Sequence, residues 1–134
     1  TLPSPGTAFI SVKNEDKNKI INVVKKLKYL GFKIISTIGT NKFLKENGID
    51  SQMVKKVKDG ESNIIDLIKD DKVDLVINTT LSSSEIIESF SIIRTSLIKQ
   101  IPYFTTVSGA YAGVDAIEYL NKESMKVRAL QDFF

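Results

Sequence analysis

The sequence predicts a doubly wound α/β domain, in which a five-stranded, mainly parallel sheet lies between two helical layers. Short apolar segments rich in β-branched residues alternate with segments of helical periodicity along the chain. Strands that alternate with helices are joined by right-handed crossovers, which place helices on both faces of a parallel sheet. The chain of 134 residues is 42% hydrophobic and 26% charged. Its length and composition therefore suit one three-layer domain with a single core.

Five segments are predicted to be strands because each is short, apolar and bounded by polar or glycine-containing turns. Pro102 stands at the start of the last segment, where the sheet needs no hydrogen-bond donor. In chain order, the predicted strands cover residues 7–12, 32–36, 53–57, 73–77 and 101–106.

A helix is predicted after each strand. The first has apolar residues at spacings of three and four, which predicts one buried face. These residues are Ile20, Val23, Val24, Leu27 and Leu30. Asn14, Glu15 and Asp16 are expected to supply its N-cap and first-turn acids, and Gly31 to end it. Residues 37–40 are predicted to form a tight turn, and the later helices to cover residues 41–47, 63–69, 86–97 and a segment from 108–110 to 120.

The composition excludes several kinds of chemistry. Cysteine and histidine are both absent, which excludes disulfides, thiolate nucleophiles and cysteine-bound metals and removes the commonest general base. No apolar run approaches the ~20 residues of a membrane-spanning helix and no secretory leader is visible, so a soluble, cytoplasmic setting without membrane contact is expected. Residues 1–6 hold two prolines and a glycine and are expected to be a linker, which leaves 7–134 as the domain.

The positive charges do not predict nucleic-acid binding. The chain carries 19 basic and 16 acidic residues, which gives a formal net charge of +3. Only Arg94 and Arg128 could make the planar bidentate contacts of base readout. The lysines are scattered among acids and no basic run exceeds two residues. They are therefore interpreted as a solvated surface rather than a nucleic-acid interface.

The expected carboxyl ends of the strands carry the candidate functional residues, because doubly wound sheets bind ligands there. Three strand ends offer small hydroxyl or amide side chains, namely Ser11, residues 37–40 and residues 78–80. Gly39 would let a ligand approach the backbone at a helix N-terminus, and Lys17 and Lys56 could converge on the same edge. This combination suits a phosphate monoester, an acceptor-only dianion.

A plainer interpretation stays open for the same residues. Thr40 and Thr80 could be ordinary N-caps, Gly39 could serve only its turn, and both lysines could be solvated. The chain contains neither a P-loop nor a Gly-x-Gly-x-x-Gly motif. Residues 109–113 are a small-residue stretch, interpreted as close helix–sheet packing.

No catalytic residue and no metal site is predicted. Asp59 and Glu61 flank Gly60 in a turn, and residues 70–71 are typical of a solvated helix end. Tyr103 and Thr105 alternate along the last predicted strand and would share one face while Phe104 takes the other. Pattern alone favours a β-forming strand followed by an N-cap.

These same positions carry a family resemblance. The chain resembles the C-terminal allosteric domains of carbamoyl-phosphate synthetase large subunits, which have the methylglyoxal-synthase-like fold. The matching stretches run in order and cover residues 6–12, 30–32, 37–40, 56–60, 75–80 and 101–106, with 127–131 similar to the end of such subunits. No single stretch is decisive, but the ordered set is specific.

The resemblance implies a regulatory domain that is not itself catalytic and holds no cofactor, within a cytoplasmic ligase of pyrimidine and arginine biosynthesis. It implies nucleotide effectors, with UMP as inhibitor and IMP as activator. The residues that correspond to the family's phosphate site are Lys17, Thr37, Thr40, Lys56, Asn78 and Thr80, with Ser11 and Thr79 nearby. Tyr103 and Thr105 correspond to the domain's contribution to an ornithine site. The implied partners are the catalytic domains of the same large subunit and the glutaminase small subunit.

One departure and three alternatives qualify the resemblance. Family members usually carry two adjacent arginines where this chain has Ile93 and Arg94, and whether Lys99 substitutes is open. Methylglyoxal synthases, which eliminate phosphate from a triose phosphate, rely on a histidine and a Gly-Gly-Asp loop that this chain lacks. The cyclohydrolase domain of purine synthesis is a thinner match. A basic nucleic-acid-binding module would predict steeply salt-dependent duplex binding.

Overall fold

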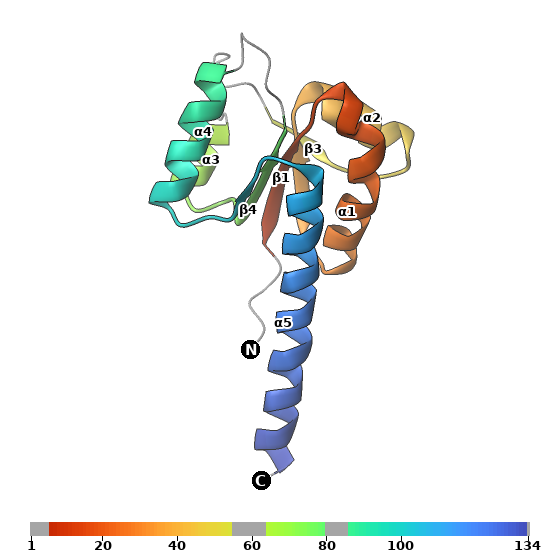
Figure 1. Cartoon of the computed structure of the whole chain (residues 1–134), viewed down its shortest axis with the longest axis vertical. Helices are drawn as coiled ribbons and strands as arrows, with labels where there is room; N and C mark the ends of the chain where they lie inside the picture. Colours follow the sequence, from red (N-terminus) through yellow and green to blue (C-terminus); the bar gives the residue numbers. More distant parts are fainter. Residues whose placement is uncertain (1–5, 55–63, 80–85, 134) are drawn as a thin grey trace.

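The computed structural model describes residues 6–54, 64–79 and 86–133. In these residues a five-stranded sheet lies between two helical layers (Figure 1). The strand order is β3-β2-β1-β4-β5 and every pairing is parallel. The predicted doubly wound α/β class is therefore confirmed.

The elements follow the predicted order. The strands are β1 (Thr7–Ser11), β2 (Lys33–Ser36), β3 (Gln52–Met53), β4 (Leu75–Asn78) and β5 (Tyr103–Phe104). The helices are α1 (Lys17–Tyr29), α2 (Ile38–Glu46), α3 (Ile64–Lys69), α4 (Ile86–Ile98) and α5 (Val107–Phe133). A short 3-10 helix, η1 (Asn14–Asp16), leads into α1. The predicted linker, residues 1–6, falls almost wholly outside the described residues.

The start of α2 differs from the prediction. Residues 37–40 are not a separate tight turn, because α2 begins at Ile38 rather than at Asn41. Thr37 is the N-cap, with an extended backbone (φ −71°, ψ 164°), and its carbonyl accepts the Asn41 N–H at 2.7 Å. The sequence signal for a helix is weak at residues 37–40 because glycine, here Gly39, has a low helix propensity. The helix nevertheless forms because Leu44, which is fully buried, packs into the core.

Four other boundaries differ from the predicted ones. Asn14, Glu15 and Asp16 form η1 rather than the first turn of α1. In the described residues β3 ends at Met53, and the predicted continuation through residues 55–57 lies outside them. β5 is only two residues long because its pairing with β4 covers Tyr103 and Phe104 alone. The last helix extends well past residue 120 and projects beyond the sheet in Figure 1.

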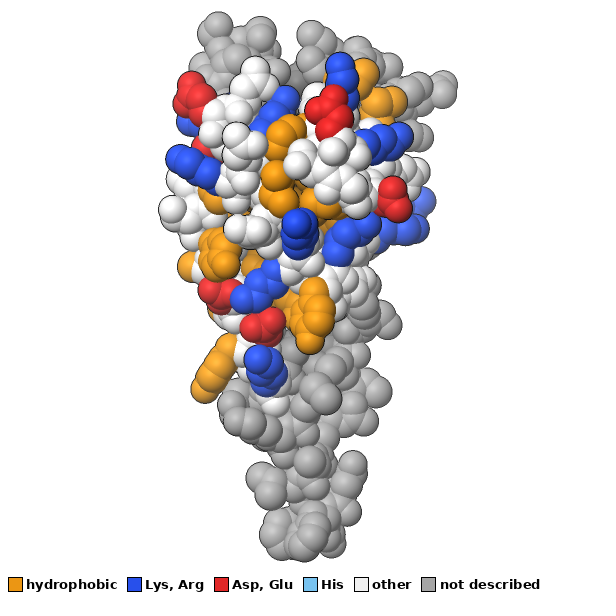
Figure 2. Space-filling model, turned by 90° about the vertical axis from the view of Figure 1, so that its right-hand side faces the viewer, with side chains coloured by type: hydrophobic (Ala, Val, Ile, Leu, Met, Phe, Trp, Pro, Cys, Tyr) orange, Lys and Arg blue, Asp and Glu red, His pale blue; other side chains and the backbone are white. Residues whose placement is uncertain are grey.

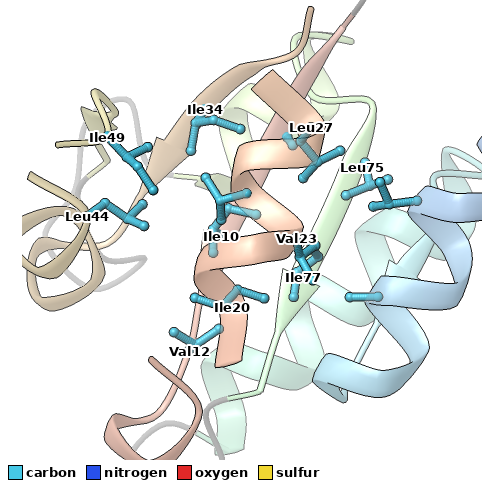
Figure 3. Close-up of a cluster of buried hydrophobic side chains, with 14 residues drawn as sticks. Ile10, Val12, Ile20, Val23, Leu27, Ile34, Leu44, Ile49, Leu75 and Ile77 are labelled. Atoms are coloured by element: carbon cyan, nitrogen blue, oxygen red, sulfur yellow. The ribbon is translucent and has the colours of Figure 1, made fainter. Parts of the chain in front are cut away.

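Side chains alternate across the sheet and supply two separate cores. Ile10 of β1 faces α1, α2 and α5, as Figure 3 shows, whereas Phe9 faces α3 and α4. The predicted buried face of α1 is confirmed, because four of its residues are at most 1% exposed. They are Ile20, Val23, Val24 and Leu27. Gly31 ends the turn after α1 with a left-handed backbone (φ 95°), as expected of a C-terminal glycine.

The small residues of α5 bring this helix close to the sheet. A Cβ at Gly113 would lie only 2.2 Å from Cζ of Phe104, and Ala110 and Val114 beside it are buried. The interpretation of residues 109–113 as a helix–sheet packing segment therefore fits the structure. Lys26 of α1 adds an electrostatic contact, since its ammonium is hydrogen-bonded to Asp115 and lies 3.5 Å from Oε1 of Glu118. These carboxylates raise the pKa of Lys26.

The described side chains over α1 and α5 form no continuous basic patch. On the face drawn in Figure 2, lysines alternate with acidic and apolar side chains. Mixed charge of this kind is typical of a solvated face rather than of a phosphate-backbone interface. Among the described helices, none is both long enough and apolar enough to cross a bilayer.

Candidate functional site at the carboxyl edge of the sheet

The strand order reverses between β1 and β4, and this junction organises the candidate site. The chain passes from β1 outward to β2 on one side and from β4 outward to β5 on the other. Ser11 and Asn78, the last residues of β1 and β4, are direct register partners. Both side chains are buried, at 6% and 4% exposed. The structure therefore brings these two predicted residues together at the position where doubly wound sheets bind ligands.

Three hydroxyl groups cluster where β1 meets the start of α2. Oγ1 of Thr37 lies 3.3 Å from Oγ of Ser11 and 3.4 Å from Oγ1 of Thr40. A hydroxyl carries a single proton, so Thr37 can donate to only one of these oxygens at a time. The other hydroxyl protons in the cluster can turn toward an additional acceptor. Such a cluster suits a group that presents several acceptor oxygens.

Two buried threonines complete the backbone hydrogen bonding beyond β1. The Val12 N–H donates to Oγ1 of Thr40 at 3.2 Å, and the Lys13 N–H donates to Oγ1 of Thr79 at 3.1 Å. Thr40 is therefore not the N-cap that the plainer interpretation allowed, since it lies inside α2 and binds a strand 28 residues away. Because each threonine accepts through oxygen, its own proton stays available for a ligand.

The first turn of α2 is electropositive. The Thr37 side chain makes no capping hydrogen bond, so it leaves the first N–H groups of the helix available. A Cβ built on Gly39 would lie 3.6 Å from Nζ of Lys17, which places that ammonium directly over this turn. Lys17 is itself the first residue of α1. A helix N-terminus beside an ammonium group favours an anion.

Tyr103 lies next to this cluster and is joined to it through Asn78. Nδ2 of Asn78 donates a hydrogen bond to the Tyr103 hydroxyl oxygen at 3.0 Å. Burial raises the pKa of Tyr103, and the bond from Asn78 only partly opposes this effect. The phenol therefore stays protonated at neutral pH and keeps a proton for a further acceptor. Tyr103 packs on the α3 side of the sheet and Phe104 on the α5 side, as the alternation predicted.

The remaining predicted residues either fall outside the described residues or do not join this cluster. Lys56 and Thr80 lie outside the described residues, as do Asp59 and Glu61. Thr105 is exposed in the bend between β5 and α5, so strand alternation does not extend to it. Lys99 lies at the other end of α4, after its last turn, where it pairs with Asp71 at 3.1 Å. In this structure it does not substitute for an arginine at the candidate site.

Sequence reasoning missed a second polar cluster beneath α2. Nδ2 of Asn41 donates to the carbonyl oxygen and to Oγ of Ser51, both at 2.7 Å, and Oγ of Ser36 lies 2.9 Å from Oγ of Ser51. Ser36 and Asn41 are buried. This cluster joins the start of α2 to the segment that enters β3 and so fixes the position of the electropositive turn. The sequence signal for this cluster was that Ser36 and Asn41, which flank residues 37–40, are polar although the strand and helix patterns place both at buried positions.

The described residues contain no group of three or more acidic side chains that could hold a metal ion. What they bring together is a set of hydroxyls, a side-chain amide, free helix N–H groups and one ammonium. Such donors can hold an oxyanion.

Comparison with known proteins bears on the same region. The family model described as the MGS-like domain matches residues 19–105, which include the start of α2 and the ends of β2, β4 and β5. A crystal structure titled ForH superposes with a TM-score of 0.59 over 87% of this chain and 81% of that chain. Because the two sequences are only 15% identical, this likeness concerns the fold alone.

Curated relatives at higher identity are large chains of one enzyme. The chain is 44% identical over 133 residues to the carbamoyl phosphate synthase large chain of Brucella suis, covering 99% of this chain and 11% of that protein. It is 40% identical to the C-terminal section of that large chain from Methanopyrus kandleri, covering 98% and 24%. The corresponding protein of Aquifex aeolicus is 38% identical, with 99% and 26% covered. The chain thus spans at most about a quarter of the length of these relatives, and the resemblance found in the sequence is confirmed.

Proposed function

The chain belongs to the MGS-like domain family, and from this we propose that it is a regulatory domain that binds a nucleoside monophosphate at the carboxyl edge of its sheet. The proposal places it within a carbamoyl phosphate synthase large chain, the protein to which it is similar over nearly its whole length. UMP is the proposed inhibitor and IMP the proposed activator. The catalytic part of the large chain and a glutaminase subunit are the proposed partners.

The observation that carries the proposal is the position of the Lys17 ammonium over Gly39 at the uncapped start of α2. A phosphate at this turn would accept hydrogen bonds from the helix N–H groups and from the hydroxyls of Thr37 and Ser11. Charge-assisted hydrogen bonds of this kind are the strong ones, at about 1.5–3 kcal/mol each. Lys56 and Thr80, by the family resemblance, would complete the phosphate shell.

Regulation requires that the effector distinguish two arrangements of this domain against the catalytic part. An effector shifts such an equilibrium only by its difference in affinity for the two states, typically by about 1–3 kcal/mol. The proposed ornithine contacts, Tyr103 and Thr105, would lie at the adjoining strand end. Asn78, a proposed contact of the nucleotide phosphate, is hydrogen-bonded to Tyr103. The two effector sites would therefore share one hydrogen bond.

Isothermal titration of the chain with UMP, IMP and inorganic phosphate tests the proposal. We expect saturable binding of both nucleotides, with Lys17→Ala weakening both by about tenfold because the phosphate loses the ammonium that lies over this turn. Lys19→Ala is the matched control, since Lys19 lies two residues along the same helix and is exposed. Equal affinities for the wild type and Lys17→Ala, or binding that Lys19→Ala weakens equally, would contradict a phosphate site at this turn.

A further inference from the structure

A cavity of about 670 Å³ lies on the α3 face of the sheet and shares no lining residue with the candidate phosphate site. Its walls include Lys33 of β2 and Asp74, which flank Thr7 on either side across the sheet. Leu67 of α3 forms another wall of the cavity. Cavities of about 300–1,000 Å³ are the size that small-molecule sites have.

Part of the cavity wall is apolar, and the rest is formed by polar and charged residues. Ile35 and Val54 line the cavity and are 5% and 6% exposed. They form a floor that is continuous with the core between the sheet and the helices α3 and α4. Leu67 adds a partly buried apolar wall. An apolar floor of this kind favours a ligand that carries a hydrocarbon or aromatic body.

The charged side chains around the cavity differ in whether they already have a partner. Oδ2 of Asp74 accepts the Thr7 N–H at 2.8 Å, and Oδ1 of Asp71 pairs with Nζ of Lys99 at 3.1 Å. Asp71 is therefore neutralised by an ion pair, whereas Asp74 is hydrogen-bonded but keeps its negative charge. Lys33 and Lys72 also line the cavity, and within the described part of the chain neither makes an ion pair. Within the described residues, two unpaired ammonium groups thus stand against one unpaired carboxylate, that of Asp74, so the unpaired charge is positive in sum.

We propose that this cavity is a second ligand site, which binds a small organic anion with an apolar body. The body would lie on Ile35, Val54 and Leu67, and the anionic group would face the ammonium groups of Lys33 and Lys72. The site is distinct from the phosphate site, because it shares no lining residue with it: its walls come from the start of β1, from β2, β3 and α3, and from the segment that leads into β4.

The probe is 8-anilinonaphthalene-1-sulfonate, a sulfonate with an aromatic body, titrated into the ¹⁵N-labelled 134-residue chain and followed by NMR and fluorescence. We expect saturable one-to-one binding, with amide shifts concentrated at Ile35, Val54 and Leu67. Saturating UMP should leave its affinity unchanged. N-phenyl-1-naphthylamine, which has the aromatic body without the sulfonate, should bind several-fold more weakly.

The double variant Lys33→Gln/Lys72→Gln tests the charge. It should bind the sulfonate about fivefold more weakly, the effect of losing two exposed ion pairs. The matched control is Lys19→Gln/Lys25→Gln, two exposed lysines on α1, which should bind like the wild type. Non-saturable binding, shifts centred elsewhere, or equal loss in both double variants would overturn the proposal. Retained far-ultraviolet circular dichroism in every variant separates these outcomes from unfolding.

Discussion

Asn78 and Tyr103 join the ends of two neighbouring strands through a single hydrogen bond, in which Nδ2 of Asn78 donates to the phenolic oxygen at 3.0 Å. Asn78 ends β4, and Tyr103 begins β5. The bond lies beside the point at which the strand order reverses, so it connects the Ser11–Thr37 cluster to the outer strand. A ligand that displaces the Asn78 side chain would therefore also change the hydrogen bonding of Tyr103.

The first prediction concerns the pH dependence of stability. Burial raises the pKa of Tyr103 above its ordinary value of 10.0, so the folded state holds this proton more tightly than the unfolded state. Stability from this group is therefore fully present below pH 10 and is lost as the pH rises from there through the folded-state pKa. Urea denaturation between pH 9 and 11 should show a steeper loss for the wild type than for Tyr103→Phe. Parallel curves would contradict the effect, and Tyr119→Phe, at a position 63% exposed, is the matched control.

The second prediction concerns the buried cluster beneath α2. Asn41→Asp replaces the amide that donates to Ser51 by a group that repels the Ser51 carbonyl oxygen. We expect a loss of about 2 kcal/mol in the free energy of unfolding, since a buried acceptor loses its donor. Asn47→Asp, at the exposed C-cap of the same helix, should cost less than about 1 kcal/mol. Urea denaturation compares the two, and equal losses would show that the Asn41 contacts are not stabilising.

The sequence predicted the layered fold well because its signals are local. The apolar spacing of α1 and the short β-prone segments depend on residues close together in the chain, and the structure confirms both. Boundaries were less predictable. The length of β5 depends on its pairing with β4, and the start of α2 depends on Leu44 reaching the core. Neither dependence can be inferred from the residues of the segment alone.

The candidate site was predictable as a set of positions but not as a network. Strand-end rules placed Ser11, Thr37 and Asn78 at one edge, and the structure brings them to the same edge. No local pattern could indicate that Thr40 accepts a hydrogen bond from Val12, 28 residues away, rather than capping a helix. The Asn41–Ser51 contact was missed for the same reason, since it joins a helix to the segment before β3.

The third prediction tests the close approach of α5 to the sheet. A Cβ at Gly113 would lie 2.2 Å from Cζ and 2.7 Å from Cε1 of Phe104, so Gly113→Ala must displace the ring. Overpacking of this kind typically costs about 1–3 kcal/mol, which exceeds the helix propensity gained. Thermal denaturation should show a lower Tm than the wild type. The double variant Gly113→Ala/Phe104→Leu should recover part of the loss, and failure of Gly113→Ala to lower Tm would disprove the tight contact.

The fourth prediction separates binding from stability at Gly39. The Cβ of Gly39→Ala would lie 3.6 Å from Nζ of Lys17, an ordinary contact, so the fold should accept it. Alanine should stabilise α2 by up to about 1 kcal/mol, because glycine has the greater entropy to lose on folding. The same methyl group would fill the space between the ammonium and the first-turn N–H groups, where the phosphate is proposed to lie. Titration should therefore show UMP binding at least about tenfold weaker, equivalent to about 1.4 kcal/mol, in a protein no less stable than the wild type. Unchanged affinity in a stabilised variant would mean that the anion does not use this turn, whereas a parallel loss of stability would attribute the weaker binding to a disturbed helix.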